Sequence, residues 1–271
     1  ILNKVFICIQ TVLATAFITF SIILQVGYDN MINIDSGCDH EDLFYLLPSD
    51  RLEPESNCFT HYDALRSELL THPEIEAVDY TNSTVFNSYT VDMWLDEDGN
   101  QTKHTNQFYC TPEAFDIYRF NITERFSNEP YGIWMTESFK EIFDKSEFLQ
   151  EEFDDTDASF KFLGVIEDFP GNGVPTLADD KPAGFIYVFP KEYVNDYNLA
   201  YIIRTNGDHE QARKVIAEAY EKISGCKVVD PRHIGRESMY LTEILERDLQ
   251  KIEFIKNVVS GIALMIVLIA I

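Results

Sequence analysis

Lysine and arginine are scarce in this 271-residue chain, which has 21 of them against 46 aspartates and glutamates and a net charge of −25. Outside residues 28–250 the charged side chains are Lys4, Lys251, Lys256 and Glu253, which sum to +2, so the intervening segment carries −27. A surface this acidic repels the phosphates of nucleic acids and of anionic lipid headgroups. Nucleic-acid binding is therefore excluded.

Motifs that carry common chemistry are also missing. The chain has no Gly-x4-Gly-Lys-Ser/Thr phosphate loop, no Gly-x-Ser-x-Gly elbow and no His-Glu-x-x-His pair. The acidic run at residues 38–42 could in principle hold a divalent metal, but five consecutive residues cannot all point inward, and a solvated turn is the better interpretation. We expect no catalytic residue, no cofactor and no metal site. No residue pattern in the sequence therefore supports an enzymatic function.

Cysteine is limited to five residues, and Cys8 lies inside an apolar segment. Cys38, Cys58, Cys110 and Cys226 allow three pairings, and none of their spacings is a metal or redox signature. Cys38–Cys58 is the pairing we place first, because both residues flank the same early strand.

Charge is absent from the 22 residues Val5–Val26, which as a helix would be about 33 Å long. A signal peptide usually has a core of about 7–15 residues and a small-x-small cleavage site, and this segment has neither. A buried core helix would show a polar face, and this segment has none, so a core helix is not favoured. We predict a transmembrane helix over residues 5–27. The uncharged run at 257–271 stops within apolar sequence, so we expect the start of a second span and a chain that is a piece of a larger membrane protein.

The acidic middle is predicted to lie outside the cytoplasm, because Lys4 precedes the first span and cytoplasmic loops favour basic residues. Two β-α-β patterns frame it. In the first, Leu43–Leu47 and Ile75–Thr84 are strands around a helix that Thr60 caps. In the second, the strand Ala200–Arg204 precedes a helix between Asp208 and Gly225, and residues 227–231 form a short strand.

Two such halves with an insertion between them predict an α+β fold with two lobes. A split β-α-β, ferredoxin-like lobe (42–89 and 199–235) would carry an inserted mixed α/β lobe (90–198), together forming a domain over 28–238. In the insertion, residues 98–100 predict a hairpin turn, Thr111-Pro112 starts a helix, and 147–157 is an acidic loop.

Several segments resemble the permease subunits of MacB/FtsX-type ABC transporters with a MacB-like periplasmic core domain. These are Phe108–Phe115, Ile133–Phe139 and, most specifically, Phe162–Phe169, which is similar to a recurrent Val-x-Gly-Val-x-x-Asp-Phe strand. They occur in the family's order between two apolar segments.

The resemblance implies a non-catalytic subunit of the bacterial inner membrane, with residues 28–250 in the periplasm. It further implies an ABC ATPase partner, a second permease copy or half, a periplasmic adaptor or other envelope protein, and coupling of ATP hydrolysis to motion of the periplasmic domain. The alternative is the extracytoplasmic sensor domain of a two-span receptor or histidine kinase, which also needs no catalytic motif.

An apolar stripe runs along the helix expected over residues 239–256. Its members recur at helical spacing and are Leu241, Ile244, Leu245, Leu249, Ile252 and Ile255. The stripe alone fits a helix packed on its own domain as well as a stalk. Its unbroken join to the second apolar segment favours a stalk that packs against the extension of the first span and transmits motion.

Overall fold

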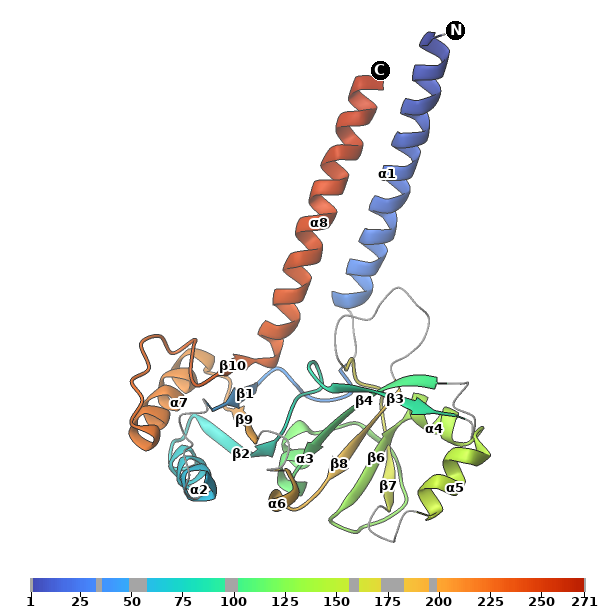
Figure 1. Cartoon of the computed structure of the whole chain (residues 1–271). Helices are drawn as coiled ribbons and strands as arrows, with labels where there is room; N and C mark the ends of the chain where they lie inside the picture. The colour runs from blue at the N-terminus through green and yellow to red at the C-terminus, as the bar shows by residue number, and fades with distance from the viewer. Residues whose placement is uncertain are drawn as a thin grey trace. The chain divides into compact units, whose positions relative to one another are not determined.

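The structure is a computed structural model that describes residues 2–32, 36–48, 58–95, 102–155, 161–171, 183–194 and 199–270 (Figure 1). It divides into two compact units. The helical unit comprises Ile1–Ile34, Val174–Asp179 and Leu245–Ile271, and the sheet unit comprises Asp35–Gly173 and Asp180–Ile244.

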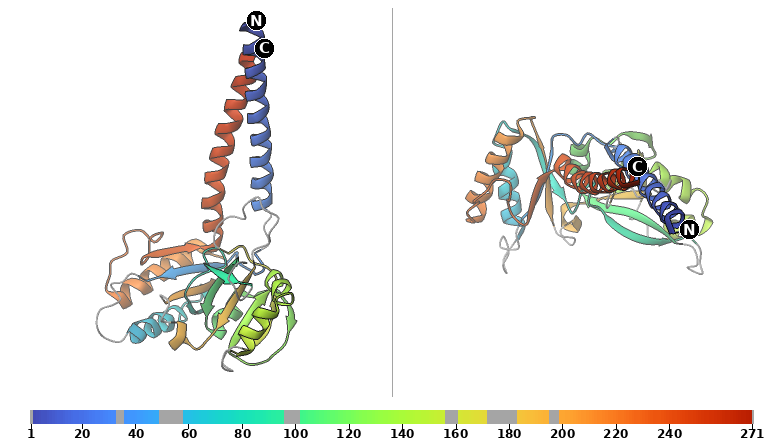
Figure 2. Two further views of the ribbon diagram at one scale, coloured as in Figure 1. Left: turned by 45° about the vertical axis from the view of Figure 1, so that its right-hand side comes forward. Right: turned by 90° about the horizontal axis from the view of Figure 1, so that it is seen from above.

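The helical unit contains α1 (Leu2–Ile32) and the part of α8 (Leu241–Ala270) that starts at Leu245. The two helices run side by side, with both chain ends at the same end of the unit (Figures 1 and 2). Among the described residues, one stretch is long and apolar enough to cross a membrane, Ile9–Asp29, and it overlaps the predicted span 5–27. The structure does not describe several side chains between 263 and 270, so the second span stays a prediction.

The sheet unit is built on a ten-stranded sheet in the described residues, ordered β10-β1-β9-β2-β4-β8-β6-β7-β5, with β3 paired to β4. The β4–β8 and β6–β7 pairs are parallel and the others antiparallel, so the predicted α+β class is confirmed. The strands are β1 (Leu43–Leu47), β2 (Ile75–Thr81), β3 (Tyr89–Trp94), β4 (Thr102–Cys110), β5 (Ile122–Arg125), β6 (Gly132–Thr136), β7 (Phe162–Ile166), β8 (Gly184–Val188), β9 (Ala200–Thr205) and β10 (Glu237–Tyr240). The remaining helices are α2 (Cys58–Leu69), α3 (Pro112–Tyr118), α4 (Glu137–Phe143), α5 (Glu147–Asp155), α6 (Lys191–Val194) and α7 (His209–Ser224).

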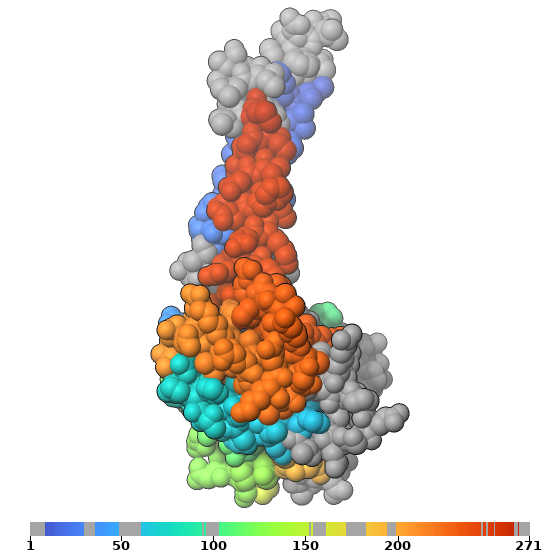
Figure 3. Space-filling model, turned by 90° about the vertical axis from the view of Figure 1, so that its left-hand side faces the viewer, coloured from blue at the N-terminus to red at the C-terminus, as the bar shows by residue number. Residues whose placement is uncertain are grey.

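Side chains of β1 alternate between two cores, as the two-residue period of a strand requires. Phe44 and Leu46 pack with α2 and α7, which cover that face of the sheet (Figure 3). Leu43 and Tyr45 pack on the other face with α3 and the first turn of α8. The sheet is therefore buried on both sides where β1 and β9 lie.

The caps predicted for α7 are confirmed. Asp208 accepts a hydrogen bond from the backbone N–H of Gln211 at 3.1 Å. Gly225 ends the helix in the left-handed conformation, with φ of 68°. The apolar residues of α7 form a buried stripe, with Ile223 half-buried at its end.

The strand predicted at residues 227–231 is wrong, and so is the start of the stalk helix at residue 239. The last strand is β10, which pairs with β1 through Phe44↔Tyr240. Pro231 has no N–H to donate to a ladder, whereas Ser238 and Tyr240 alternate as buried residues and fit an edge strand. The helix that follows begins at Leu241.

Two further predictions need correction. Thr60 does not cap α2, because that helix begins at Cys58 and includes Thr60 in its first turn. The segment expected as an acidic loop is helical over Glu147–Asp155, where Leu149 is fully buried and Phe153 packs edge-on against Phe143. Apolar residues four positions apart outweighed the surrounding acidic charge.

The β3–β4 hairpin is confirmed, although its turn at residues 98–100 lies outside the described residues. Thr111 caps α3 by accepting from the backbone N–H of Ala114 at 3.3 Å, with Pro112 at the first helical position, as predicted. The side chain of Cys58 is not described, so the Cys38–Cys58 pairing stays a prediction.

Candidate functional site

The predicted apolar stripe of α8 begins inside the core of the sheet unit. Leu241 and Ile244 are 0% and 5% exposed and belong to the same apolar cluster as α3 and β9. Leu249 is half-buried and Ile255 is 48% exposed. The side chains of Leu245 and Ile252 lie outside the described residues. The coupling role of the stripe stays a prediction.

The first turn of α8 is capped from within. The carboxylate of Glu243 accepts a hydrogen bond from the backbone N–H of Tyr240 at 2.9 Å, which is the return half of a capping box. Its other oxygen accepts from Arg213 on α7 at 2.7 Å. Glu243 therefore ties the start of α8 to α7.

Two side chains of α7, His209 and Arg213, also hold the ring of Tyr240. The imidazole of His209 stacks on it at 3.9 Å, and the guanidinium of Arg213 lies 5.1 Å from its centroid. The Tyr240 hydroxyl donates to the backbone carbonyl of His209 at 3.1 Å, and the ring meets Phe44 edge-on. We call Asp42, His209, Arg213, Tyr240 and Glu243 the α8 anchor.

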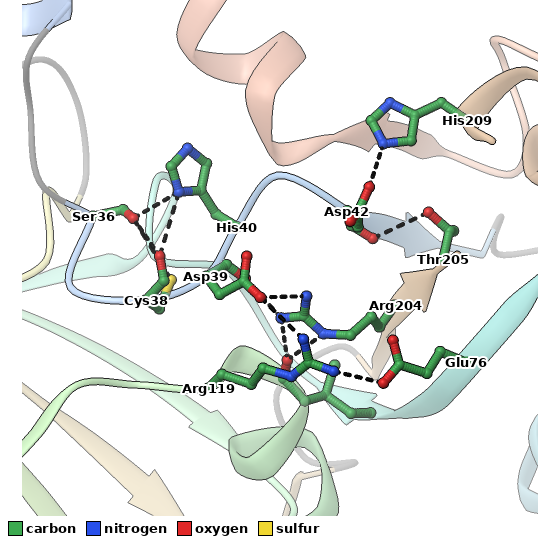
Figure 4. A network of polar contacts seen from close by, with 11 residues as sticks. Ser36, Cys38, Asp39, His40, Asp42, Glu76, Arg119, Arg204, Thr205 and His209 are labelled. Atoms are coloured by element: carbon green, nitrogen blue, oxygen red, sulfur yellow. Dashed lines mark hydrogen bonds and ion pairs between the residues drawn. The ribbon is translucent and has the colours of Figure 1, made fainter. Parts of the chain in front are cut away.

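Asp42 joins the α8 anchor to the segment before β1. Its carboxylate lies 2.8 Å from Nε2 of His209. Its backbone carbonyl accepts from the backbone N–H of Thr205 at 3.0 Å. The same carbonyl also accepts from the Thr205 hydroxyl at 3.3 Å (Figure 4). Residues 36–42, which follow α1 in the sequence, are thus tied to both β9 and the start of α7.

A second set of contacts holds the same segment through a buried arginine (Figure 4). Arg204, on β9, is 2% exposed, and two of its nitrogens donate to the backbone carbonyl of Ile117 at 3.0 and 2.7 Å. It also donates to the carboxylate of Asp39 at 3.0 Å and to the Asp39 carbonyl at 2.7 Å. Burial lowers the pKa of Arg204, while the Asp39 carboxylate acts in the opposite direction.

Arg119 completes this group, which we call the Arg204 network: Asp39, Glu76, Ile117, Arg119 and Arg204. Arg119 follows α3 with φ of 52°, a left-handed conformation that costs a residue with a Cβ about 1–2 kcal/mol. In that conformation its guanidinium donates to Asp39 at 3.1 Å and also to Glu76. The conformation places one guanidinium between carboxylates of two segments.

The run at residues 38–42 contains the expected turn, with Asp39 and Glu41 exposed, but Arg204 and His209 also hold it to the fold. Gly37 has φ of 65°, and a Cβ there would lie 2.7 Å from the Asp168 carbonyl, so the segment passes too close to its neighbour for any other residue. Arg204 was the signal that sequence reasoning missed. A charge in the apolar run Ala200–Thr205 must have a partner, and Asp39 supplies it.

Across the described residues, no group of three or more His, Cys, Asp or Glu could hold a metal ion. The anchor and the network connect the segment after α1, the edge of the sheet and the first turn of α8.

The alkaline stability of the protein should depend on Tyr240. Burial raises the pKa of its phenol from 10.0 to about 12. The neutral phenol thus contributes stability that is complete below pH 10 and lost as pH rises to about 12. We expect the free energy of unfolding of the wild type to fall more steeply over this range than that of Tyr240→Phe. Tyr131→Phe, at an exposed ring, is the control and should keep the wild-type slope; equal slopes for all three would refute the assignment.

Comparison with known proteins identifies no family for this chain. No family model matches the chain, and no curated protein matches it. The structure is similar to the crystal structure of the extracellular domain of the noncanonic ABC-type transporter YknZ from Gram-positive bacteria, with a TM-score of 0.41 and 11% sequence identity. The match covers 68% of this chain and 95% of that one. A likeness at this level does not establish a family or a function.

Proposed function

We propose that this chain is a permease subunit of a MacB/FtsX-type ABC transporter that couples ATP hydrolysis by a partner to motion of its periplasmic domain. The observation that carries the proposal is the continuity of α8. The helix runs without a break from a capped and buried first turn at Leu241 to Ala270, inside the second apolar segment. An α-helix is stiff along its axis, so force on one end reaches the other.

The segments that resemble the family support the proposal because they depend on one another in the fold. Asp168, from the Phe162–Phe169 segment, accepts from the backbone N–H and hydroxyl of Ser138 at 2.9 and 2.7 Å, and Ser138 belongs to the Ile133–Phe139 segment. Gly164 has no room for a side chain, because a Cβ would lie 2.2 Å from the Glu124 carbonyl and 2.6 Å from the Trp134 ring.

The strand order also fits the proposed lobe. In β10-β1-β9-β2 all neighbours are antiparallel, and α2 and α7 lie on one face, which is the arrangement of a split β-α-β, ferredoxin-like unit. In the proposal this lobe and the inserted one form a domain at residues 28–238, on the periplasmic side of the bacterial inner membrane. Its partners are an ABC ATPase, a second permease copy or half, and a periplasmic adaptor or other envelope protein.

Affinity purification of the full-length protein from its native membrane tests this function. We expect an ABC ATPase to be recovered with it, as a partner chain or as a domain, because residues 1–271 contain no phosphate-binding loop. An unrelated tagged membrane protein from the same cells is the control. Recovery without any ABC ATPase chain or domain, or with a kinase module on the same polypeptide, would favour the sensor alternative.

A further inference from the structure

The two helices of the helical unit meet along a seam with coiled-coil spacing. On α1 the half-buried side chains recur at steps of three and four: Gln10, Ala14, Phe17, Ser21, Leu24 and Tyr28. On α8, Val259 is 9% exposed, with Lys256 and Ser260 half-buried beside it. The remaining described face of α1 exposes large apolar residues, such as Val12 and Ile22.

Two polar contacts interrupt this apolar seam. The hydroxyls of Ser21 and Ser260 share a hydrogen bond of 2.6 Å. Ser21 lies inside the apolar stretch Ile9–Asp29, where a hydroxyl without a partner would lose a hydrogen bond that lipid cannot replace. The two serines face each other, and so can share this hydrogen bond, in only one register of the two helices.

The second contact lies near the end of the same stretch. The ammonium group of Lys256 lies 4.1 Å from the centroid of the Tyr28 ring. Tyr28 is seven residues beyond Ser21, whereas Lys256 is only four residues before Ser260 on the antiparallel helix. Side chains lean towards the N-terminus of their own helix, and this direction lets the long lysine reach Tyr28.

We propose that Ser21–Ser260 and Tyr28–Lys256 form a polar lock that holds α1 and α8 in one register with and without ATP, so that the two helices move as one body. A slide of one helical turn would separate both pairs at once. That the two contacts form does not depend on the proposed function. That they stay formed when ATP is present rests on the proposed function.

Disulfide trapping in the full-length protein tests the lock. Ser21→Cys and Ser260→Cys are combined with Cys8→Ala, and a protease site is inserted after Val229, which is 89% exposed, so that cleavage reports the cross-link on a gel. Membranes are oxidised from cells with normal ATP and from cells depleted of ATP. Ile22→Cys with Ser260→Cys is the mismatched control, because Ile22 is 59% exposed and off the seam, and Ser260→Cys alone controls for native thiols.

We expect the matched pair to cross-link at least about tenfold faster than both controls, at the same rate in both kinds of cells, because only facing Cβ atoms reach disulfide geometry. If the first pair does not express, Tyr28→Cys with Lys256→Cys is joined by a short bifunctional thiol reagent instead of by oxidation, because these two side chains meet only through their far ends. Rates no higher than those of the controls would overturn the lock whatever the function. Fast cross-linking in only one kind of cell would overturn the single-body claim and leave the proposed function standing.

Discussion

Replacing Arg204 by Ala is expected to lower the free energy of unfolding of the sheet unit by about 3 kcal/mol. The substitution removes a fully buried side chain and leaves the Ile117 carbonyl without its two donors. It also removes the two hydrogen bonds from Arg204 to Asp39, so residues 36–42 are held by fewer contacts. Urea unfolding of the full chain in detergent, followed by the fluorescence of the buried Trp134, measures the change.

Arg119→Ala is the matched control, because Arg119 binds the same carboxylate with a half-exposed guanidinium. An exposed ion pair contributes about 0–1 kcal/mol, so this variant should unfold close to the wild type. The free energy of unfolding of Asp39→Ala should fall between those of the two arginine variants, because Arg204 still donates to the backbone carbonyls of Ile117 and of residue 39. If Arg204→Ala were no less stable than Arg119→Ala, the buried network would not hold the segment.

Replacing Arg247 and Asp248 by Gly-Pro is expected to abolish transport or signalling while the protein is still made at its normal level. An interior proline costs about 3 kcal/mol and kinks the helix axis. The break falls beyond the anchor, whose last member is Glu243, so the sheet unit should melt as in the wild type. A cell-based assay together with a melting curve measures both effects.

Arg247→Ala with Asp248→Ala is the control for that variant. It removes the same two charges but keeps the helix, because alanine has the highest helix propensity. We expect it to keep its activity. Full activity of the Gly-Pro variant would show that an unbroken α8 is not needed, and the stalk hypothesis would be wrong.

Local signals in the sequence were enough to predict much of this fold. The apolar runs of β1 and β9 have no competing interpretation, and α7 carries an Asp cap, an apolar stripe and a terminal Gly that agree with one another. Elements of this kind are specified by residues close together in the chain.

Elements that depend on distant residues could not be predicted in the same way. β10 is a four-residue edge strand with ordinary composition, and only its pairing with β1 defines it. The sequence pattern predicts a start of α8 two residues before the observed one at Leu241, although Glu243 three positions after Tyr240 is the signal of a capping box. The partner of Arg204 is 165 residues away in the chain, and no periodicity identifies it.

Motion of the sheet unit in response to nucleotide is the most direct measure of the central claim. A spin label would be placed at Val229→Cys, an exposed site in the sheet unit of each of two permease copies, in a chain whose Cys8, Cys58 and Cys226 are replaced by Ser. With the ATPase partner bound, adding a non-hydrolysable ATP analogue should shift the distance distribution between the labels. The Ala-Ala control should shift alike and the Gly-Pro variant should not. An unchanged distribution in the wild type, or the same shift in the Gly-Pro variant, would contradict the claim that α8 carries motion to the domain.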